Sequence, residues 1–434
     1  MSTGDAVSTG DAVSTGDAVS TGDAVSTGDT VSTGDTVSTG DTPAGAGQPS
    51  ADGLGGPLGG LRVIEFSGKG PAPFAAMLMS DLGARVLRIE RVPPPERHPD
   101  YREELDLLRR GRTDVGIDLK AAAGLDLALD LVASADVLIE GYRPGVMEKL
   151  GLGPDVCLAR NPRLVYGRAT GWGQTGPLAM AAGHDINFLA VSGVLTMLGR
   201  AGGPPTPPAN ILGDFGGGGM LLAVGVLAAA LAAAGSGRGQ VVDASILEGS
   251  SLLATLLYGL RAAGQWSDER GTNLLDTGAP YYDVYETADG RWMALGAVEP
   301  RFYHALLATL GVDDPVFRNP ADRSVWPPLR ARLTETFRSR TQAEWVERFR
   351  GVDACVSPVL TPDEAAVHPH NQERGLFVRH RGVTQPGPAP KFSATPARIP
   401  EPAAADTGNP FAGWGVADAR VGALVDQGIV VRSS

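Results

Sequence analysis

The chain has 434 residues, of which 43% are hydrophobic, 20% charged and 6% aromatic, and this composition excludes a fibrous or wholly disordered protein. Its formal net charge is −12, but eight of the acidic side chains precede Arg62, the first basic residue, so the rest of the chain carries about −4. An acidic balance gives no electrostatic footprint for nucleic acid, and two cysteines are too few for a disulfide framework. We therefore expect a globular protein of the reducing cytoplasm that binds no nucleic acid.

The N-terminal tail is a sequence repeat. Between Met1 and Pro43 the hexamer Ser-Thr-Gly-Asp-Ala/Thr-Val occurs seven times, with Pro replacing Val in the last copy. One Val and one Asp per six residues bury too little surface to offset the entropy of ordering, so residues 1–60 are predicted to be a disordered tail and linker. The tail also lacks the basic region and apolar run of a signal peptide.

Strand and helix signals alternate from Leu61 onward. The alternation indicates βαβ crossovers and a mainly parallel sheet, and thus an α/β fold. Buried strands are predicted at 61–66, 84–89, 115–119, 137–140 and 164–166, with helices at 73–82 and 124–134 between them.

An uncharged stretch at 215–237 is long enough to span a bilayer. It consists mostly of Ala and Gly, and small residues also allow close helix packing in a soluble core. We predict a buried helix here and no membrane association. The following segment, 240–253, is predicted to be helical at its end.

The pattern changes after residue 270. Residues 280–285 and 292–297 flank an Asp-Gly turn and predict a hairpin, with helices to follow at 301–310 and 330–338. The simplest organisation has a small domain at 270–385 and a large domain at 61–250 plus 400–434. The connectors are then 251–269 and 386–399, and a final helix at 415–427 is expected to pack on the large domain.

Several common sites are disfavoured by their motifs. The first βα turn, Gly68 to Pro73, resembles a dinucleotide fingerprint but has Pro73 in place of the third glycine, which argues against NAD. The sequence contains no phosphate-binding P-loop and no Gly-x-Ser-x-Gly elbow. Its six histidines lack the spacing of a zinc site.

Polar residues precede two apolar stretches. Gly183-His184-Asp185 comes before 188–198, and Gly213-Asp214 comes before the Ala-rich stretch. By residue type, both aspartates fit helix caps that accept backbone N–H bonds. A carboxylate and an imidazole brought together in a dry pocket would instead form an acid/base pair. Spacing alone leaves both interpretations open.

Arginines cluster near the carboxyl ends of the predicted strands. Open α/β sheets bind ligands at this edge, and arginine suits phosphate through bidentate contacts. Any one of them is as well explained by solvated surface charge. Together they favour an anionic nucleotide, and they are Arg88, Arg91, Arg109, Arg110, Arg112 and Arg143.

Further motifs occur in a fixed order along the chain. They are LRVIE (61–65), PAPF (71–74), DLGA (81–84), EGYRPGV (140–146), GWGQTGP (171–177), AGHDIN (182–187), GDFGGG (213–218), DTGAPYY (276–282), GAVEP (296–300), DAC (353–355) and PVL (358–360). With them, the chain from Leu61 to about Arg398 resembles the α-methylacyl-CoA racemases of the family III CoA-transferase superfamily.

The resemblance implies a fold and an assembly. Family members have a large Rossmann-like CoA-binding α/β domain, formed by the two ends of the chain, and a smaller α/β domain between them. Two subunits interlock as a homodimer, and the active site lies between the large domain of one subunit and the small domain of its partner.

The resemblance also implies an activity. The racemases invert the α-carbon of 2-methylacyl-CoA thioesters in lipid and fatty acid metabolism, by two-base proton abstraction and return through an enolate-like intermediate. His184 and Asp214 match the two acid/base residues, and Glu299 matches a glutamate that orients the histidine. A helix N-terminus and backbone N–H groups would stabilise the thioester oxygen. No metal or redox cofactor is implied, because CoA is part of the substrate.

For CoA, the resemblance points to two groups of positions. Likeness to the family assigns phosphate or adenine contacts to Arg91, Lys120 and Arg143, with Ile117 and Lys149 as further positions. The loop from Gly183 to Phe188, including Asp185, is expected along the pantetheine.

Two departures from the family pattern affect the CoA contacts. The segment 92–108 is longer than usual, and Thr113 and Asp114 stand where many members have a basic residue and a serine. Both departures weaken the expected contacts to the CoA phosphates.

The closest alternative is CoA transfer between carboxylic acids, with Asp185 as the nucleophile that forms an anhydride. His184 directly before it, together with Asp214 and Glu299, favours the racemase. A CoA-binding protein without turnover is a third possibility, and the presence of all three acid/base candidates argues against it.

Overall fold

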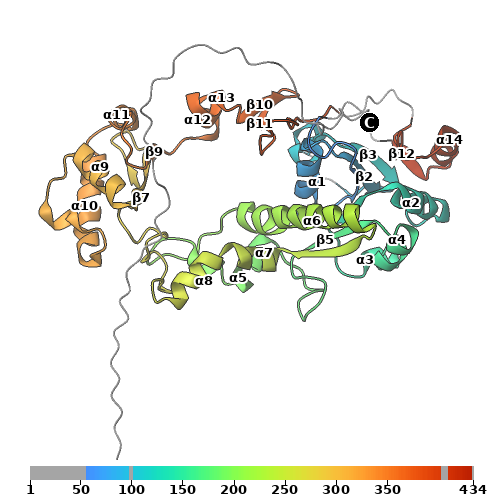
Figure 1. Ribbon diagram of the computed structural model, residues 1–434, viewed down its shortest axis with the longest axis horizontal. Helices are drawn as coiled ribbons and strands as arrows, with labels where there is room; N and C mark the ends of the chain where they lie inside the picture. Colours follow the sequence, from blue (N-terminus) through green and yellow to red (C-terminus); the bar gives the residue numbers. More distant parts are fainter. Residues whose placement is uncertain (1–54, 97–100, 402–408, 433–434) are drawn as a thin grey trace, which may run out of the picture. The chain divides into compact units, whose positions relative to one another are not determined.

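The structure is a computed structural model that describes residues 55–96, 101–401 and 409–432, all within the unit Pro49–Ser434 (Figure 1). Residues 1–54 of the predicted tail lie outside the described residues, so their predicted disorder stays a prediction. At its end, Leu58 packs on the core of the large domain and donates its backbone N–H to Leu82, so the ordered chain begins before residue 61.

A seven-stranded sheet dominates the large domain, and the α/β prediction is confirmed. The strand order is β12-β3-β2-β1-β4-β5-β6, and every neighbouring pair is parallel except β12 with β3. The order reverses between β1 and β4, so the carboxyl ends of these two strands form the topological switch point where such sheets bind ligands. The strands are β1 (Arg62–Phe66), β2 (Arg85–Arg91), β3 (Thr113–Ile117), β4 (Val137–Glu140), β5 (Val165–Thr170), β6 (Gln240–Ser245) and β12 (Val430–Arg432).

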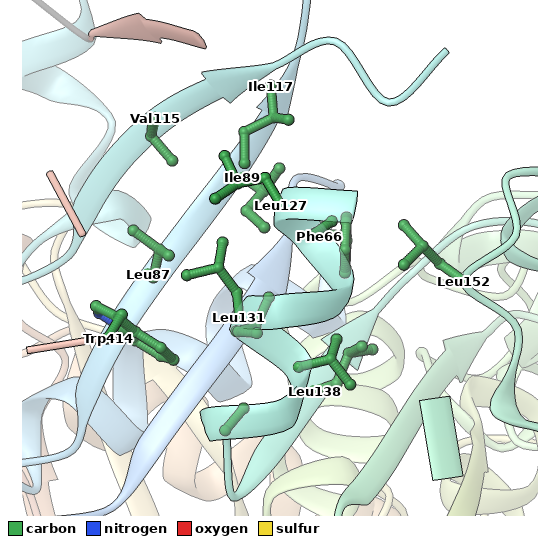
Figure 2. Close-up of a cluster of buried hydrophobic side chains, with 14 of the residues drawn as sticks. Phe66, Leu87, Ile89, Val115, Ile117, Leu127, Leu131, Leu138, Leu152 and Trp414 are labelled. Carbon is green, nitrogen blue, oxygen red and sulfur yellow. The ribbon is translucent and has the colours of Figure 1, made fainter. Parts of the chain in front are cut away.

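Alternate side chains of the strands pack on opposite faces of this sheet, as a parallel sheet buried on both sides requires. One face packs Leu87 and Ile89 against α2 (Ala122–Ser134), with Trp414 closing the cluster (Figure 2). The other face packs against α1 (Pro71–Asp81) and α6 (Leu221–Ser236). The C-terminal helix α14 (Asp418–Asp426) joins the first cluster, which confirms that the chain end returns to the large domain.

The apolar stretch after residue 210 differs from its prediction. It begins with a π-helical segment, η4 (Ile211–Met220), and continues as α6, which buries only one face. Val224 and Leu231 on the other face are 61% and 78% exposed, so the helix predicted here as buried is buried on one face only. Within the described residues, Ile211–Ser236 is the one helix long and apolar enough to cross a membrane.

The glycine run of η4 allows this segment to approach its neighbours closely. A Cβ on Gly217 would lie 2.7 Å from the backbone nitrogen of Ser250, and one on Gly219 would lie 2.7 Å from the Phe74 ring. These approaches bring η4 against α1 and α7 (Ile246–Leu253). Other helices of this domain are α3 (Val146–Lys149), α4 (Pro154–Arg160), α5 (Asp185–Val191) and α8 (Thr255–Ala262).

The small domain has its own core around a three-stranded antiparallel sheet, β7-β8-β9. The predicted hairpin is confirmed, with Tyr282 paired with Gly296. The predicted connector at 251–269 is partly helical, since it contains α8. The elements are β7 (Tyr282–Glu286), β8 (Trp292–Gly296), α9 (Pro300–Leu310), α10 (Trp326–Phe337), α11 (Gln342–Arg348) and β9 (Val356–Pro358), followed by α12 (Pro362–Val367), α13 (Pro369–Glu373), β10 (Phe377–His380) and β11 (Val383–Pro386).

Candidate active site

A cleft of about 450 Å³ opens at the switch point of the large sheet. Its walls come from the turn between β1 and α1, the loop 141–144 after β4, the segment 169–172 at the end of β5, and the N-terminus of α5. Because the carboxyl ends of parallel strands meet at one edge, the fold brings these separate loops into one site.

His184 and Asp214 both line this cleft. His184 is the exposed residue just before α5, and its backbone N–H donates to Oδ1 of Asn187 at 3.0 Å. Asp214 projects from the first turn of η4, where its carboxylate lies against the turn ahead of α1: a Cβ on Gly70 would be 3.3 Å from Oδ2 of Asp214. The fold therefore places an imidazole and a carboxylate in one cleft from segments 30 residues apart.

Burial raises the pKa of the Asp214 carboxyl, and the negative charge of Asp185 raises it further. A hydrogen bond from the Asn210 side chain and the charge of His184 act in the opposite direction. A carboxyl with a raised pKa holds a proton more readily, which suits a group that must both accept and return one.

Neither aspartate forms the helix cap that residue type suggested. Asp214 lies inside η4, which begins at Ile211, so it does not cap that helix. Asp185 is the first residue of α5, but its Oδ1 accepts the backbone N–H of Asp214 at 2.7 Å. Asp185 is only 8% exposed and is not among the described residues that line the cleft. Its carboxylate thus faces the main chain of the neighbouring segment.

Glu299 lies in the small domain, at the N-cap of α9. After burial, its negative charge is the largest influence that raises the pKa of the Cys355 thiol, so its carboxylate is close to that residue. The described part of a single chain does not place Glu299 in the wall of the cleft with His184.

The positions expected to contact CoA fall into two groups. Arg143 lines the cleft, and Arg91, Lys120 and Lys149 are exposed. Ile117 stays a prediction, although its side chain is 0% exposed and packs in the core of the large domain (Figure 2), because the inward face of β3 carries it. Its side chain is therefore not available to a ligand.

The expected pantetheine loop forms one wall of the cleft. Gly183 and Phe188 both line it, and the Phe188 ring meets the Trp172 ring edge-on at 4.8 Å between centroids. A Cβ on Gly183 would lie 2.6 Å from the Phe188 ring, so a larger residue would push the loop away from this aromatic pair.

Most of the arginines expected to face a phosphate are instead paired inside the protein. Carboxylates of β1, β2, β3 and α1 pair with four of the six, and only Arg91 and Arg143 keep exposed side chains. Asp114, one of the departures from the family pattern, pairs with two of the four buried arginines, Arg88 and Arg109. The ion pairs are Arg88 with Glu90 (3.0 Å) and Asp114 (3.1 Å), Arg109 with Asp114 (2.5 Å), Arg110 with Asp81 (2.5 Å), and Arg112 with Glu65.

Sequence reasoning missed Lys69 as a cleft residue. It is exposed, lines the cleft and lies in the turn directly after β1, at the switch point. The signal was a basic residue in the first βα turn. It was missed because the turn was considered only for the glycines of a dinucleotide site. Among the described residues, no cluster of His, Cys, Asp and Glu could hold a metal ion.

With this fold and this cleft, the chain belongs to CoA-transferase family III, whose sequence model matches residues 58–408. It is 44% identical over 341 residues to the α-methylacyl-CoA racemase of Mus musculus, a match that covers 78% of this chain and 87% of that protein. Identity to the α-methylacyl-CoA racemase of Homo sapiens is 43% with the same coverage. The crystal structure of Rv3272 from M. tuberculosis matches with a TM-score of 0.66 and 27% identity, covering 81% of this chain and 98% of that one.

Proposed function

We propose that the protein is a racemase that inverts the α-carbon of 2-methylacyl-CoA thioesters by two-base proton transfer. The observation that carries the proposal is the placement of His184 and Asp214 in one cleft at the switch point. The high identity to α-methylacyl-CoA racemases over most of the chain supports the same reaction.

In this mechanism the α-carbon lies between His184 and Asp214. One of them removes the α-proton from one face, and the other returns a proton to the opposite face. Because its pKa is raised, the Asp214 carboxyl holds a proton with an affinity closer to that of the His184 imidazole. A smaller difference in proton affinity between the two groups favours proton transfer in both directions. Backbone N–H groups at the start of α5, next to His184, would stabilise the enolate oxygen.

The CoA moiety would bind along the exposed basic residues at the cleft and at the nearby strand ends. Arg143 and Lys69 line the cleft, and Arg91, Lys120 and Lys149 are the further cations that could meet its phosphates. The loop 183–188 would follow the pantetheine. Proton transfer alone needs no metal or redox cofactor, and we propose none.

We also propose a homodimer. Leu252, Leu253 and Leu256 on α7 and α8 are 55–64% exposed, and the outer face of α6 is apolar as well. A second copy would cover this surface, and the small domain of the partner would bring a second Glu299 toward His184 to orient its ring. A cytoplasmic location and a role in lipid metabolism complete the proposal.

The position of Asp185 argues against CoA transfer. A nucleophile that attacks the thioester must reach the cleft, whereas this carboxylate is buried and accepts the backbone N–H of Asp214.

The test is exchange of the α-proton. Purified protein is incubated in deuterium oxide with a single epimer of a 2-methylacyl-CoA, while mass spectrometry follows deuterium at carbon 2 and NMR follows the epimer ratio. We expect deuterium uptake with racemisation, lost in His184→Ala and in Asp214→Ala. Absence of exchange across several acyl chains, with CoA still bound, would contradict the racemase, and an acyl-acceptor screen would then test transfer.

A further inference from the structure

Asp185 is a buried carboxylate that the proposed reaction does not use. Its Oδ1 accepts the backbone N–H of Asp214 at 2.7 Å, and a hydrogen bond from the Gly213 backbone lowers the pKa of its carboxyl, which burial raises. Gly213 is buried, and a Cβ there would lie 2.8 Å from Cγ of Asp185 and closer still to Oδ1. Only glycine at 213 permits this approach, so the Gly-Asp pair and Asp185 form one local arrangement.

We propose that Asp185 is a positioning residue, which fixes the main chain of Asp214 and, when ionised, places a negative charge beside the Asp214 carboxyl. The first N–H groups of a helix have no partners within it, and a carboxylate from another element satisfies them here. The inference deepens the proposed racemase function and rests on it for the role of Asp214.

The charge of Asp185 has a defined direction of effect on Asp214. It raises the pKa of the Asp214 carboxyl in addition to burial, while Asn210 and His184 lower it. Other charged groups on the surrounding elements are Lys69 ahead of α1, Arg143 after β4, Glu248 of α7, which accepts the Ser245 hydroxyl at 2.6 Å, and Asp243 of β6, which accepts the backbone N–H of Gln174 at 3.2 Å.

Asp185→Asn separates the two parts of this role, because the amide keeps an oxygen acceptor and loses the charge. We expect exchange at the optimum pH to stay within roughly tenfold of the unmodified protein, short of the loss of about 10²- to 10⁴-fold that follows removal of an acid/base group. The acidic limb of the pH profile should move to lower pH, because Asp214 then ionises more easily. Asp243→Asn removes a carboxylate that also accepts a backbone N–H, and it should leave the limb in place.

A second measurement does not depend on turnover. NMR titration of ¹³C-labelled aspartate carboxyls, with Asp214→Asn to assign the signal, should show a lower Asp214 pKa in Asp185→Asn. If the unmodified protein exchanges no substrate, the proposed function fails, and this titration still decides whether the two carboxyls are coupled. An unchanged Asp214 pKa and acidic limb would overturn the inference, as would a hydroxamate formed on Asp185 when substrate and hydroxylamine are added together.

Discussion

A single methyl group at position 213 should displace Asp185 and disable the cleft. In Gly213→Ala the new Cβ would overlap the Asp185 carboxylate, and Oδ1 would have to move by about 1 Å to reach an ordinary contact distance. Gly213 does not have a left-handed backbone conformation, so alanine causes no backbone strain there. The destabilisation expected for Gly213→Ala comes from the steric overlap alone. The carboxylate has little room to move, since it is 8% exposed and Cγ of Leu189 lies 3.3 Å from the same Cβ.

Two magnitudes follow for Gly213→Ala. Loss of the charged hydrogen bond to the Asp214 N–H should lower the free energy of unfolding by about 1.5–3 kcal/mol. A shift of about 1 Å in a group that positions the chemistry can cost on the order of 100-fold in rate, so kcat for α-proton exchange should fall by that factor. The effect should appear in kcat more than in KM, because the displaced carboxylate holds the main chain of Asp214, an acid/base residue of the proposed reaction.

The assay combines deuterium exchange with urea unfolding. Gly235→Ala is the matched control: this glycine also lies in a helix, but its Cβ would meet nothing within 4 Å, so the variant should exchange normally and gain slightly in stability. The reasoning is refuted if Gly213→Ala keeps kcat within threefold of the unmodified protein.

Three further predictions test the core, the pH dependence and the assembly. Arg112→Met removes one partner of the buried pair with Glu65 and should lower the free energy of unfolding by about 3–5 kcal/mol in urea titrations, while Glu65→Gln in the same background should recover part of that loss. Hydrogen bonds from Arg420 and Arg160 lower the pKa of Asp130, so this carboxylate stabilises the fold above its unfolded pKa and loses that contribution as the pH falls through the folded pKa. Asp130→Asn should therefore cost less than about 1 kcal/mol at pH 7, because the pair is partly exposed, and the difference from the unmodified protein should vanish in strong acid. Leu256→Asp should shift the sedimentation coefficient from dimer to monomer, whereas Val367→Asp, equally exposed at 64% outside that surface, should not; a monomer before any mutation would contradict the proposed dimer.

The elements that sequence predicted best are those whose environment is uniform along their length. Strand β4 (Val137–Glu140) was predicted to the residue, because it is buried on both faces and its sequence is an apolar run, Val-Leu-Ile, closed by a single glutamate. Strand β12 (Val430–Arg432) was missed. Its three residues form a strand because they pair with β3 in antiparallel orientation, and so short a segment has no alternating pattern of its own. The hairpin of the small domain was found because its Asp-Gly turn is a local signal.

The candidate site was less accessible to pattern reasoning. His184 and Asp214 became acid/base candidates through family resemblance, because their spacing alone equally fits two helix caps. The direction in which Asp185 points depends on η4 packing beside α5, which is a tertiary contact. The same limit explains the arginines: the count of cations near strand ends could not show that Arg88 and Arg109 share Asp114.

The turn between β1 and α1 shows why this site lacks a dinucleotide fingerprint. In a dinucleotide fold the third glycine allows close packing of the helix on the sheet, and the helix N-terminus faces a pyrophosphate. Here a glycine of the neighbouring segment allows the close packing of α1. A Cβ on Gly218 of η4 would lie 2.9 Å from Cβ of Pro71 in the first turn of that helix. The same packing brings the Asp214 carboxylate against Gly70, the N-cap of α1. An acidic side chain of the protein therefore lies at this helix N-terminus, where a ligand phosphate lies in a dinucleotide-binding fold, and glycines of η4 supply the close packing that the third glycine supplies there.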